Sequence, residues 1–206
     1  MTFFCFWPII CFPFSRELVS YIQRKDQQGG KALSKIVPAA GVLVNCIDPR
    51  FMGAALKATR HLAGNHIVVP RSRPGATLRH CRNCAVTQEL IQDIAEISIP
   101  HHGMFNLFIA HHADCLAYGG SKSFSSMEEE RDAHVVDMRA GRKLFGDEVL
   151  AHAEILLKYG DITSKERAYL ERALNGDFKV TTLFLSPPPG RRSFTDDEVR
   201  IDILQD

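Results

Sequence analysis

Residues 105–115 read FNLFIAHHADC, an apolar run that ends in two histidines, an aspartate and a cysteine. A short apolar run without polar alternation predicts a strand that is buried on both faces of a sheet. Such strands are typical of parallel sheets, in which ligands bind beyond the carboxyl ends of the strands. The stretch therefore predicts the class of the fold and places polar side chains where such a fold carries its chemistry.

Three other segments have the same apolar character: VLVNC at 42–46, HIVVP at 66–70 and VTTLFL at 180–185. Helical patterns lie between them, beginning with AVTQELIQDIAEI at 85–97. Segments 125–145, 147–160 and 164–174 predict three more helices, the first capped by Ser125 with Glu128 and the second ended by Gly160. Because parallel neighbours need a crossover connection, this alternation predicts an α/β fold with a mostly parallel central sheet flanked by helices.

The size and charge of the chain limit the kinds of function to consider. It has 206 residues, of which 45% are hydrophobic, enough for one sizeable core. We expect an N-terminal arm and helix over 1–30, a single α/β domain over 31–190 and a peripheral tail over 191–206. A formal net charge of +1 gives no electrostatic basis for binding nucleic acid or an anionic membrane surface. The function is therefore expected in a local site.

The cysteines and the N-terminal stretch indicate the cellular compartment in which the protein is expected. Six cysteines are too few for a disulfide-held mini-domain, and their placement beside His and Asp predicts metal or thiol chemistry in a reducing, cytoplasmic compartment. The apolar stretch FFCFWPIICFPF at 3–14 is interrupted by Pro8 and Pro13 and falls short of the ~20 residues of a membrane span. We expect this arm to dock on its own fold or on a partner subunit. A signal peptide and a misassigned start codon are the alternatives.

Two strands deliver candidate metal ligands to one edge of the predicted sheet. VLVNC ends in Cys46, and FNLFIA is followed by His112 and Cys115. If these strands are parallel neighbours, the three side chains converge. Two thiolates and an imidazole form a soft ligand set that suits zinc, and three protein ligands leave a fourth position for a water whose pKa the metal lowers to about 7.

Asp48 and Arg50 follow Cys46 in CIDPR. A carboxylate beside a metal can bind the metal, or it can accept the proton of a bound hydroxide, and a guanidinium can hold it away from the metal in a two-pronged pair. In the alternative interpretation, Asp48 caps a turn at Pro49 and Arg50 is solvated. For CIDPR alone the alternative is favoured, because such short groupings are common.

Taken together, the two segments resemble a known family. CIDPR resembles the Cys-x-Asp-x-Arg motif of the β-class carbonic anhydrases, and HHADC resembles their His-x-x-Cys motif, especially the His-His-x-Asp-Cys form of a compact bacterial branch. The order of the motifs, the region IVVPRSRPGAT at 67–77 and the strand VTTLFL before a Pro/Gly loop are also similar. The resemblance extends roughly over residues 35–190.

This resemblance implies specific roles. Cys46, His112 and Cys115 would be zinc ligands in a catalytic domain over 31–190, and Asp48 with Arg50 would be the dyad that orients the metal-bound hydroxide. The implied activity is that of a zinc lyase that interconverts carbon dioxide and bicarbonate. The family forms dimers by exchanging N-terminal segments, so a homodimer or a multiple of it is expected.

Two departures from the family pattern leave alternatives open. Leu116 stands where the family has glycine, and RSRPGAT at 71–77 replaces its Arg-Asn-Ala-Gly segment. Either change could favour hydrolysis of carbon disulfide or carbonyl sulfide on the same scaffold. A second alternative is a non-catalytic domain with a structural zinc held by Cys81 and Cys84 of CRNC together with HADC.

The remaining polar residues near these motifs have simpler predicted roles. We expect His101 and His102 to be surface loop residues, and His111 to point away from His112 because neighbouring side chains of a strand alternate. Asp114 is expected to cap the following turn.

Overall fold

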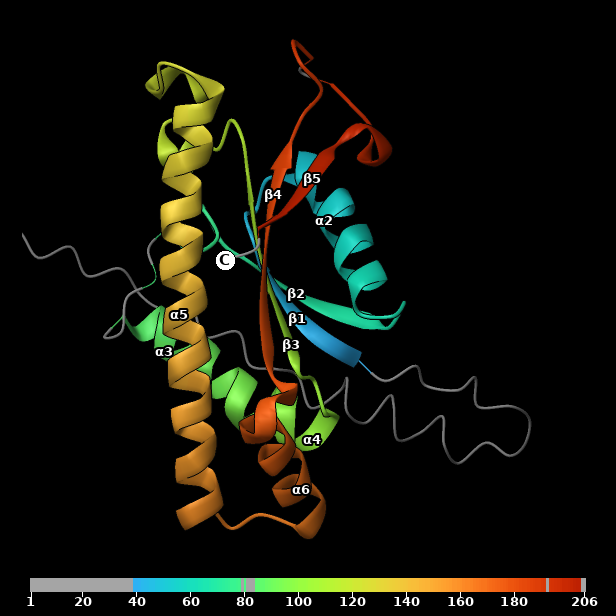
Figure 1. The fold of residues 1–206 in the computed structure, drawn as a ribbon, viewed down its shortest axis with the longest axis vertical. Coiled ribbons are helices and arrows are strands. Elements are labelled where there is room, and N and C mark those ends of the chain that lie inside the picture. Colours follow the sequence, from blue (N-terminus) through green and yellow to red (C-terminus); the bar gives the residue numbers. More distant parts are fainter. Residues whose placement is uncertain (1–38, 79, 81–83, 192, 205–206) are drawn as a thin grey trace, which may run out of the picture. The chain divides into compact units, whose positions relative to one another are not determined.

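The computed structural model describes residues 39–78, 80, 84–191 and 193–204 (Figure 1). The apolar stretch at 3–14 and the N-terminal arm and helix expected over 1–30 lie outside these residues, as does Cys81. Within them, no helix combines the length and the apolar composition needed to cross a membrane.

A five-stranded sheet in the order β2-β1-β3-β4-β5 forms the centre of the fold. Strands β2, β1, β3 and β4 are parallel to one another, and β5 is antiparallel to β4. The prediction of an α/β fold with a mostly parallel sheet is therefore confirmed. The strands are β1 (Ala39–Asn45), β2 (Ile67–Ser72), β3 (Asn106–His112), β4 (Lys179–Ser186) and β5 (Arg200–Leu204).

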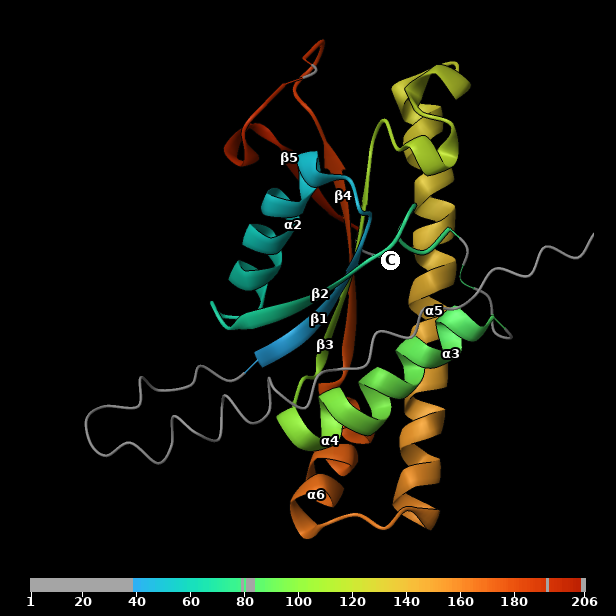
Figure 2. The same ribbon diagram turned by 180° about the vertical axis from the view of Figure 1, so that it is seen from behind.

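The apolar runs form strands that are covered on both faces, as their composition predicts. In β3, Leu107 and Ile109 pack into one core and Phe108 and Ala110 into the other. Helix α2 covers one face of the sheet, and α5 runs along the other together with α3, α4 and α6 (Figures 1 and 2). Burial on both sides fixes the positions of β1 and β3, whose carboxyl ends carry the candidate ligands.

The helices follow the predicted segments, with some changes of bounds. They are α2 (Pro49–Leu62), α3 (Ala85–Gln92), α4 (Ile99–His102), α5 (Met127–Tyr159) and α6 (Ser164–Arg172). Asp93–Ser98 joins α3 to α4 as a π-helical segment, and Ala173–Asp177 follows α6 as another. His101 and His102 therefore end a short helix instead of lying in a loop, although both are exposed as expected.

Helix α5 corrects two details of the sequence prediction. The segments predicted as two helices over 125–145 and 147–160 form one helix of 33 residues, which runs through Gly146 without a break and ends before Gly160. Its N-cap is Ser126, whose hydroxyl accepts a hydrogen bond from the Glu129 amide, and not Ser125. A single glycine weakens a helix by only about 1 kcal/mol, and packing along the sheet outweighs this cost.

The C-terminal segment contributes a strand to the sheet. The sequence predicts a peripheral tail over 191–206, but Arg200–Leu204 pairs with β4 as the edge strand β5. Val199 is buried and Ile201 packs against the core that α2 covers. The acidic composition of this segment hides the alternation of apolar residues that forms the strand.

Candidate metal centre

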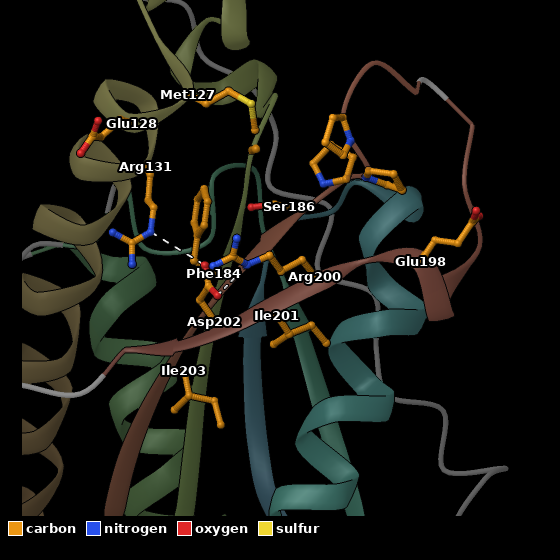
Figure 3. A pocket seen from close by; sticks show the side chains of 14 residues that line it. Met127, Glu128, Arg131, Phe184, Ser186, Glu198, Arg200, Ile201, Asp202 and Ile203 are labelled. Carbon is orange, nitrogen blue, oxygen red and sulfur yellow. Dashed lines mark hydrogen bonds and ion pairs between the residues drawn. The ribbon is translucent and has the colours of Figure 1, made fainter.

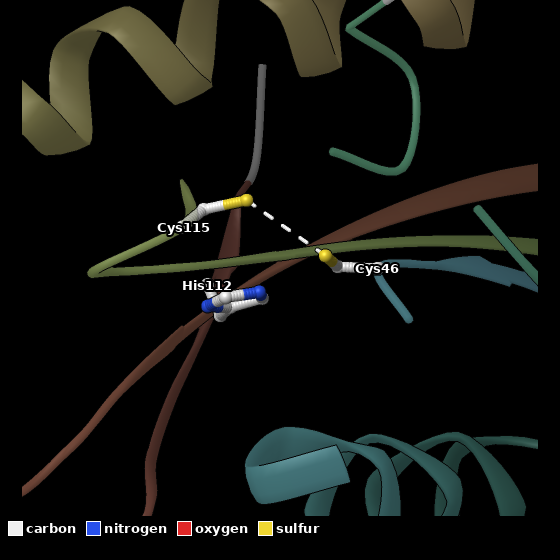
Figure 4. Close-up of side chains that lie close together, drawn as sticks. All are labelled: Cys46, His112 and Cys115. Carbon is white, nitrogen blue, oxygen red and sulfur yellow. Dashed lines mark hydrogen bonds between the residues drawn. The ribbon is translucent and has the colours of Figure 1, made fainter. Parts of the chain in front are cut away.

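The structure brings Cys46, His112 and Cys115 together at the carboxyl ends of β1 and β3. These strands are parallel neighbours in which Asn45 is opposite Ala110, so the residues that follow lie side by side. All three side chains are buried, and their sulfur and nitrogen atoms lie within 4.8 Å of one another (Figure 4). Among the described residues, they form the only such convergent group of three or more His, Cys, Asp or Glu side chains.

The geometry of this group fits a tetrahedral metal ion. The two sulfur atoms are 3.7 Å apart, and two sulfurs each about 2.3 Å from one tetrahedral zinc would be about 3.8 Å apart. The Nδ1 of His112 lies 2.7 Å from the carbonyl oxygen of Ala113 and donates its proton there. The His112 Nε2 is therefore a bare acceptor, and it is buried without a partner in the described part of the chain. A buried acceptor of this kind, beside two thiols, is the arrangement that a metal ion would satisfy.

The two thiols are not equivalent. A hydrogen bond from Cys115 lowers the pKa of Cys46, and the same contact with burial raises the pKa of Cys115. The backbone N–H of Gly75 also points to the Cys46 sulfur at 3.4 Å. The pair thus readily gives up one proton but holds the second, which a cation bound between the sulfurs would displace.

Asp48 unites the two roles that the sequence leaves open for it. It is the N-cap of α2, where its Oδ1 accepts the Arg50 N–H at 3.0 Å. It also forms a two-pronged pair with the Arg50 guanidinium, in which Nη2 lies 2.7 Å and Nε 3.1 Å from Oδ2. The same Oδ2 is 3.9 Å from the Nε2 of His112. The carboxylate is therefore held by Arg50 at the rim of the candidate ligand set.

Hydrogen bonds from Arg50 keep the Asp48 carboxylate ionised. Burial alone would raise the pKa of Asp48, but the hydrogen bonds from the Arg50 side chain and backbone outweigh burial and bring it below its ordinary value. The hydrogen bond to Asp48 in turn raises the pKa of Arg50. Asp48 is thus an anion across the neutral pH range, able to accept a proton or a hydrogen bond.

Asp114 does not cap the following turn in the way the sequence predicts. It takes a left-handed backbone conformation, with φ of 56°, which Asp tolerates better than most residues. Its Oδ1 accepts the Ser121 N–H at 3.2 Å, and its Oδ2 accepts a bond from the Arg50 Nη1 at 3.1 Å. The carboxyl of Glu130, which is 1% exposed, accepts the Asp114 N–H at 2.6 Å. The sequence gives little sign of this role for Glu130, because acidic residues in a first helical turn are common.

His111 lies on the other face of β3 from His112, as strand alternation predicts, and there it is the centre of a buried network. Its Nε2 is 2.6 Å from the Thr77 hydroxyl, and its Nδ1 is 3.0 Å from the Nδ1 of His134. The Tyr118 hydroxyl also approaches this Nδ1 and donates to Asp137 at 2.6 Å. Burial lowers the pKa of His111 well below its ordinary value. The network fixes the loop around Thr77, which carries the Gly75 N–H to Cys46.

Of the three candidate ligands, Cys46 lines a pocket with largely apolar walls. Cys46, Asp48, Arg50 and Asp114 form its polar part, and its other lining residues are Ile47, Pro49, Pro74, Leu116 and Ala117. Leu116 is 84% exposed at this opening, so its side chain does not fill the site. The pocket therefore suits a small uncharged molecule next to a charged pair.

A separate pocket lies between α5 and β5 (Figure 3). It is lined by side chains such as Phe184, Arg131 and Asp202, and the last two form an ion pair at 3.9 Å. None of the candidate ligands lines it. It is therefore distinct from the group of thiols and imidazole.

The alternative zinc site of CRNC with HADC can be followed only in part. Cys84 is disulfide-bonded, so its sulfur is not a thiolate ligand in this structure. The described residues of HADC, His112 and Cys115, converge with Cys46 instead.

Comparisons with known proteins give structural likeness only. No family model and no curated sequence matches the chain. It is similar to the β-carbonic anhydrase CafA of the fungal pathogen Aspergillus fumigatus, with 13% identity, coverage of 91% of this chain and 86% of that chain, and a TM-score of 0.40. For a tetrameric β-carbonic anhydrase of the filamentous ascomycete Sordaria macrospora, the identity is 13%, the coverage 91% and 93%, and the TM-score 0.42. For β-carbonic anhydrase isoform I of the protozoan Trichomonas vaginalis, the identity is 14%, the coverage 91% and 96%, and the TM-score 0.35. These values are too low to assign the chain to a family.

Proposed function

We propose that this protein is a zinc-dependent carbonic anhydrase that interconverts carbon dioxide and bicarbonate. The observation that carries the proposal is the convergence of Cys46, His112 and Cys115 beside the ion pair of Asp48 and Arg50. Two thiolates and one imidazole are donors that suit zinc and leave one position open for exchange. When bound there, zinc would supply a Lewis acid and bring the pKa of a water to about 7.

The residues around the ligand set would divide the remaining work. Asp48 is placed to accept a proton or hydrogen bond from a group at the open position, since its Oδ2 lies 3.9 Å from His112 Nε2. Arg50 holds that carboxylate in one orientation through Nε and Nη2. The Nδ1 contact with Ala113 and the stacking of Phe51 on His112, at 4.4 Å between ring centroids, fix the imidazole.

The pocket supports an uncharged substrate. Carbon dioxide is small and has no net charge, so it can enter between Ile47, Pro74 and Leu116 with little loss of hydration. The Arg50 guanidinium lies in the same wall between the carboxylates of Asp48 and Asp114, which occupy its N–H groups. The apolar walls thus fit an uncharged substrate.

Carbon disulfide or carbonyl sulfide remains a second candidate substrate. The apolar side chains of Leu116 and Ile47 are 84% and 55% exposed at the pocket opening, which would suit a larger and more hydrophobic molecule than carbon dioxide. The same ligands and the same Asp48 would serve that hydrolysis. The two substrates therefore need to be compared on one preparation.

Stopped-flow measurement of carbon dioxide hydration tests the proposal directly. We expect the zinc-loaded protein to hydrate carbon dioxide far above the buffer rate, to lose this activity when a chelator removes the metal, and to regain it with added zinc. Parallel assays with carbon disulfide and carbonyl sulfide distinguish the second candidate. A fully zinc-loaded protein that hydrates carbon dioxide no faster than buffer would refute the proposed activity.

A further inference from the structure

Arg50 is held between two carboxylates and not by Asp48 alone. Its Nε and Nη2 atoms donate to Asp48, whereas its Nη1 donates to the Asp114 Oδ2 at 3.1 Å. Its Nη2 is also 3.4 Å from the carbonyl oxygen of Asp114. Both edges of the guanidinium are therefore occupied, and its plane is fixed by contacts from two separate segments of the chain.

Asp114 is itself anchored to the start of α5. Its N–H donates to the buried Glu130 at 2.6 Å, and its Oδ1 accepts the Ser121 N–H. The other oxygen of Glu130 accepts the Ser121 hydroxyl at 2.8 Å. The loop over 114–121 is thus bound at both ends to one helical side chain, so the carboxylate that faces Arg50 has little freedom.

The anchoring of Asp114 matters because the Asp48 carboxylate has two competing partners, Arg50 and a metal ion bound by the candidate ligands. Its Oδ2 is 3.9 Å from His112 Nε2, the atom that would bind the metal, so a modest side-chain rotation would let the carboxylate reach a bound cation. The hydrogen bonds from Arg50 oppose that rotation only while Arg50 stays in place. Arg50 is 36% exposed, and without Asp114 its Nη1 has no other acceptor among the described residues.

We propose that Asp114 is a positioning residue that fixes Arg50 and so keeps the Asp48 carboxylate off the metal. The proposal rests on the proposed metal site and deepens it. Asp114 lies at the wall of the pocket, but its carboxylate does not bind the metal in this proposal. It acts through Arg50, and the unit that sets the open position comprises Asp48, Arg50, Asp114 and Glu130.

The test replaces Asp114 and measures access of an anion to the metal. Asp114→Asn keeps the shape and the tolerance of positive φ but loses the charge that faces Arg50. Asp114→Gly removes the side chain and adopts the same backbone conformation without strain. Each variant is loaded with cobalt in place of zinc and titrated with azide, a small anion that binds an open metal position and alters the visible spectrum.

We expect both variants to bind cobalt as the parent does but to bind azide about tenfold or more weakly, because Asp48 then occupies the position in most molecules. The double variant Asp48→Asn with Asp114→Asn should bind azide within about threefold of Asp48→Asn alone, since no carboxylate remains to compete. Asp147→Asn, on the exposed face of α5, is the matched control and should behave as the parent.

Other outcomes would overturn the inference. Azide affinities of the Asp114 variants within about twofold of the parent would show that Asp114 does not control the open position. A weaker affinity that removal of the Asp48 carboxylate fails to restore would show a general structural role. A parent protein that takes up no cobalt would overturn both the metal site and this inference. The expected azide pattern in a protein that does not hydrate carbon dioxide would support the inference and refute only the proposed function.

Discussion

At the scale of single residues, Asp48 is the side chain on which the interpretations of the sequence differ most. It caps α2 and also faces the candidate metal ligands through its pair with Arg50. Asn is as good an N-cap as Asp, so if Asp48 served only as a cap, Asp48→Asn should cost about 1 kcal/mol of stability or less and leave the activity unchanged. If the carboxylate accepts a proton in the reaction, the same change should lower the carbon dioxide hydration rate by about a hundredfold or more.

Stopped-flow kinetics and elemental analysis of this variant together check the prediction. Zinc content should stay near one per chain, because Asp48 is not among the three converging ligands. A variant that keeps its zinc and hydrates carbon dioxide at the parent rate would contradict the role of Asp48.

The buried His134, which contacts His111, predicts a pH dependence of the free energy of unfolding. Burial, with a smaller effect of His112, lowers the pKa of His134 to about 4. In the unfolded chain an ordinary histidine binds a proton near pH 6.5, so the unfolded state takes up more protons as the pH falls and the folded state is stabilised less. Between pH 7 and pH 5 this one group should lower the free energy of unfolding by up to about 2 kcal/mol.

Urea unfolding at the two pH values measures this effect. In His134→Gln the difference between pH 7 and pH 5 should shrink by about that amount, whatever the variant's absolute stability. His102→Gln, at an exposed histidine, is the control and should leave the difference unchanged. An equal pH dependence in parent and His134→Gln would contradict the predicted contribution.

The sequence predicts the residues that converge at the site but not those that support them. Cys46, His112 and Cys115 are identifiable because each lies at or just beyond the carboxyl end of an apolar strand whose end is easy to locate. Glu130, Thr77 and His134 lie on helices or loops, and their contacts depend on how α5 packs against the sheet. No local pattern encodes that packing, so their roles appear only in three dimensions.

At the scale of elements, α5 shows that glycines in one helix can have different roles. A methyl group at Gly141 would lie 3.0 Å from the Thr77 Cγ2, whereas one at Gly146 would meet nothing within 4 Å. Gly146→Ala should therefore raise the free energy of unfolding by about 0.5–1 kcal/mol through helix propensity. Gly141→Ala should gain less or lose stability, because it pushes on the loop that His111 holds.

Chemical denaturation of the two variants under the same conditions tests this difference. Equal stabilisation by both alanines would contradict the close approach of α5 to Thr77. The sequence prediction of a helix break near Gly146 was wrong, because a single glycine is tolerated when the rest of the helix packs along a sheet.

At the scale of the whole molecule, the fold class follows from the alternation of strands and helices, but the spatial order of strands does not. That β1 lies between β2 and β3, which places Cys46 beside His112, depends on long-range packing. The edge strand β5 was hidden in an acidic tail. The expected N-terminal arm and helix over 1–30, the domain bounds and the cytoplasmic location stay predictions.

We also propose that the protein is a homodimer or a multiple of one. The stretch at 3–14 is more apolar than a free terminus should be, which suits a segment that packs against a partner subunit. Light scattering at micromolar concentration should give a mass of at least twice the 23.1 kDa of the chain. A stable monomer would contradict this expectation.

The central claim is that Cys46, His112 and Cys115 hold one zinc ion, and elemental analysis of purified variants tests it most directly. We predict one zinc per chain in the parent and in Cys81→Ser and Cys84→Ser, and loss of most of the zinc in Cys46→Ser, His112→Ala and Cys115→Ser, with folding checked by circular dichroism. Full retention of zinc in Cys46→Ser, His112→Ala and Cys115→Ser, with loss of zinc in Cys81→Ser and Cys84→Ser, would contradict this claim. It would favour a structural zinc site built on CRNC.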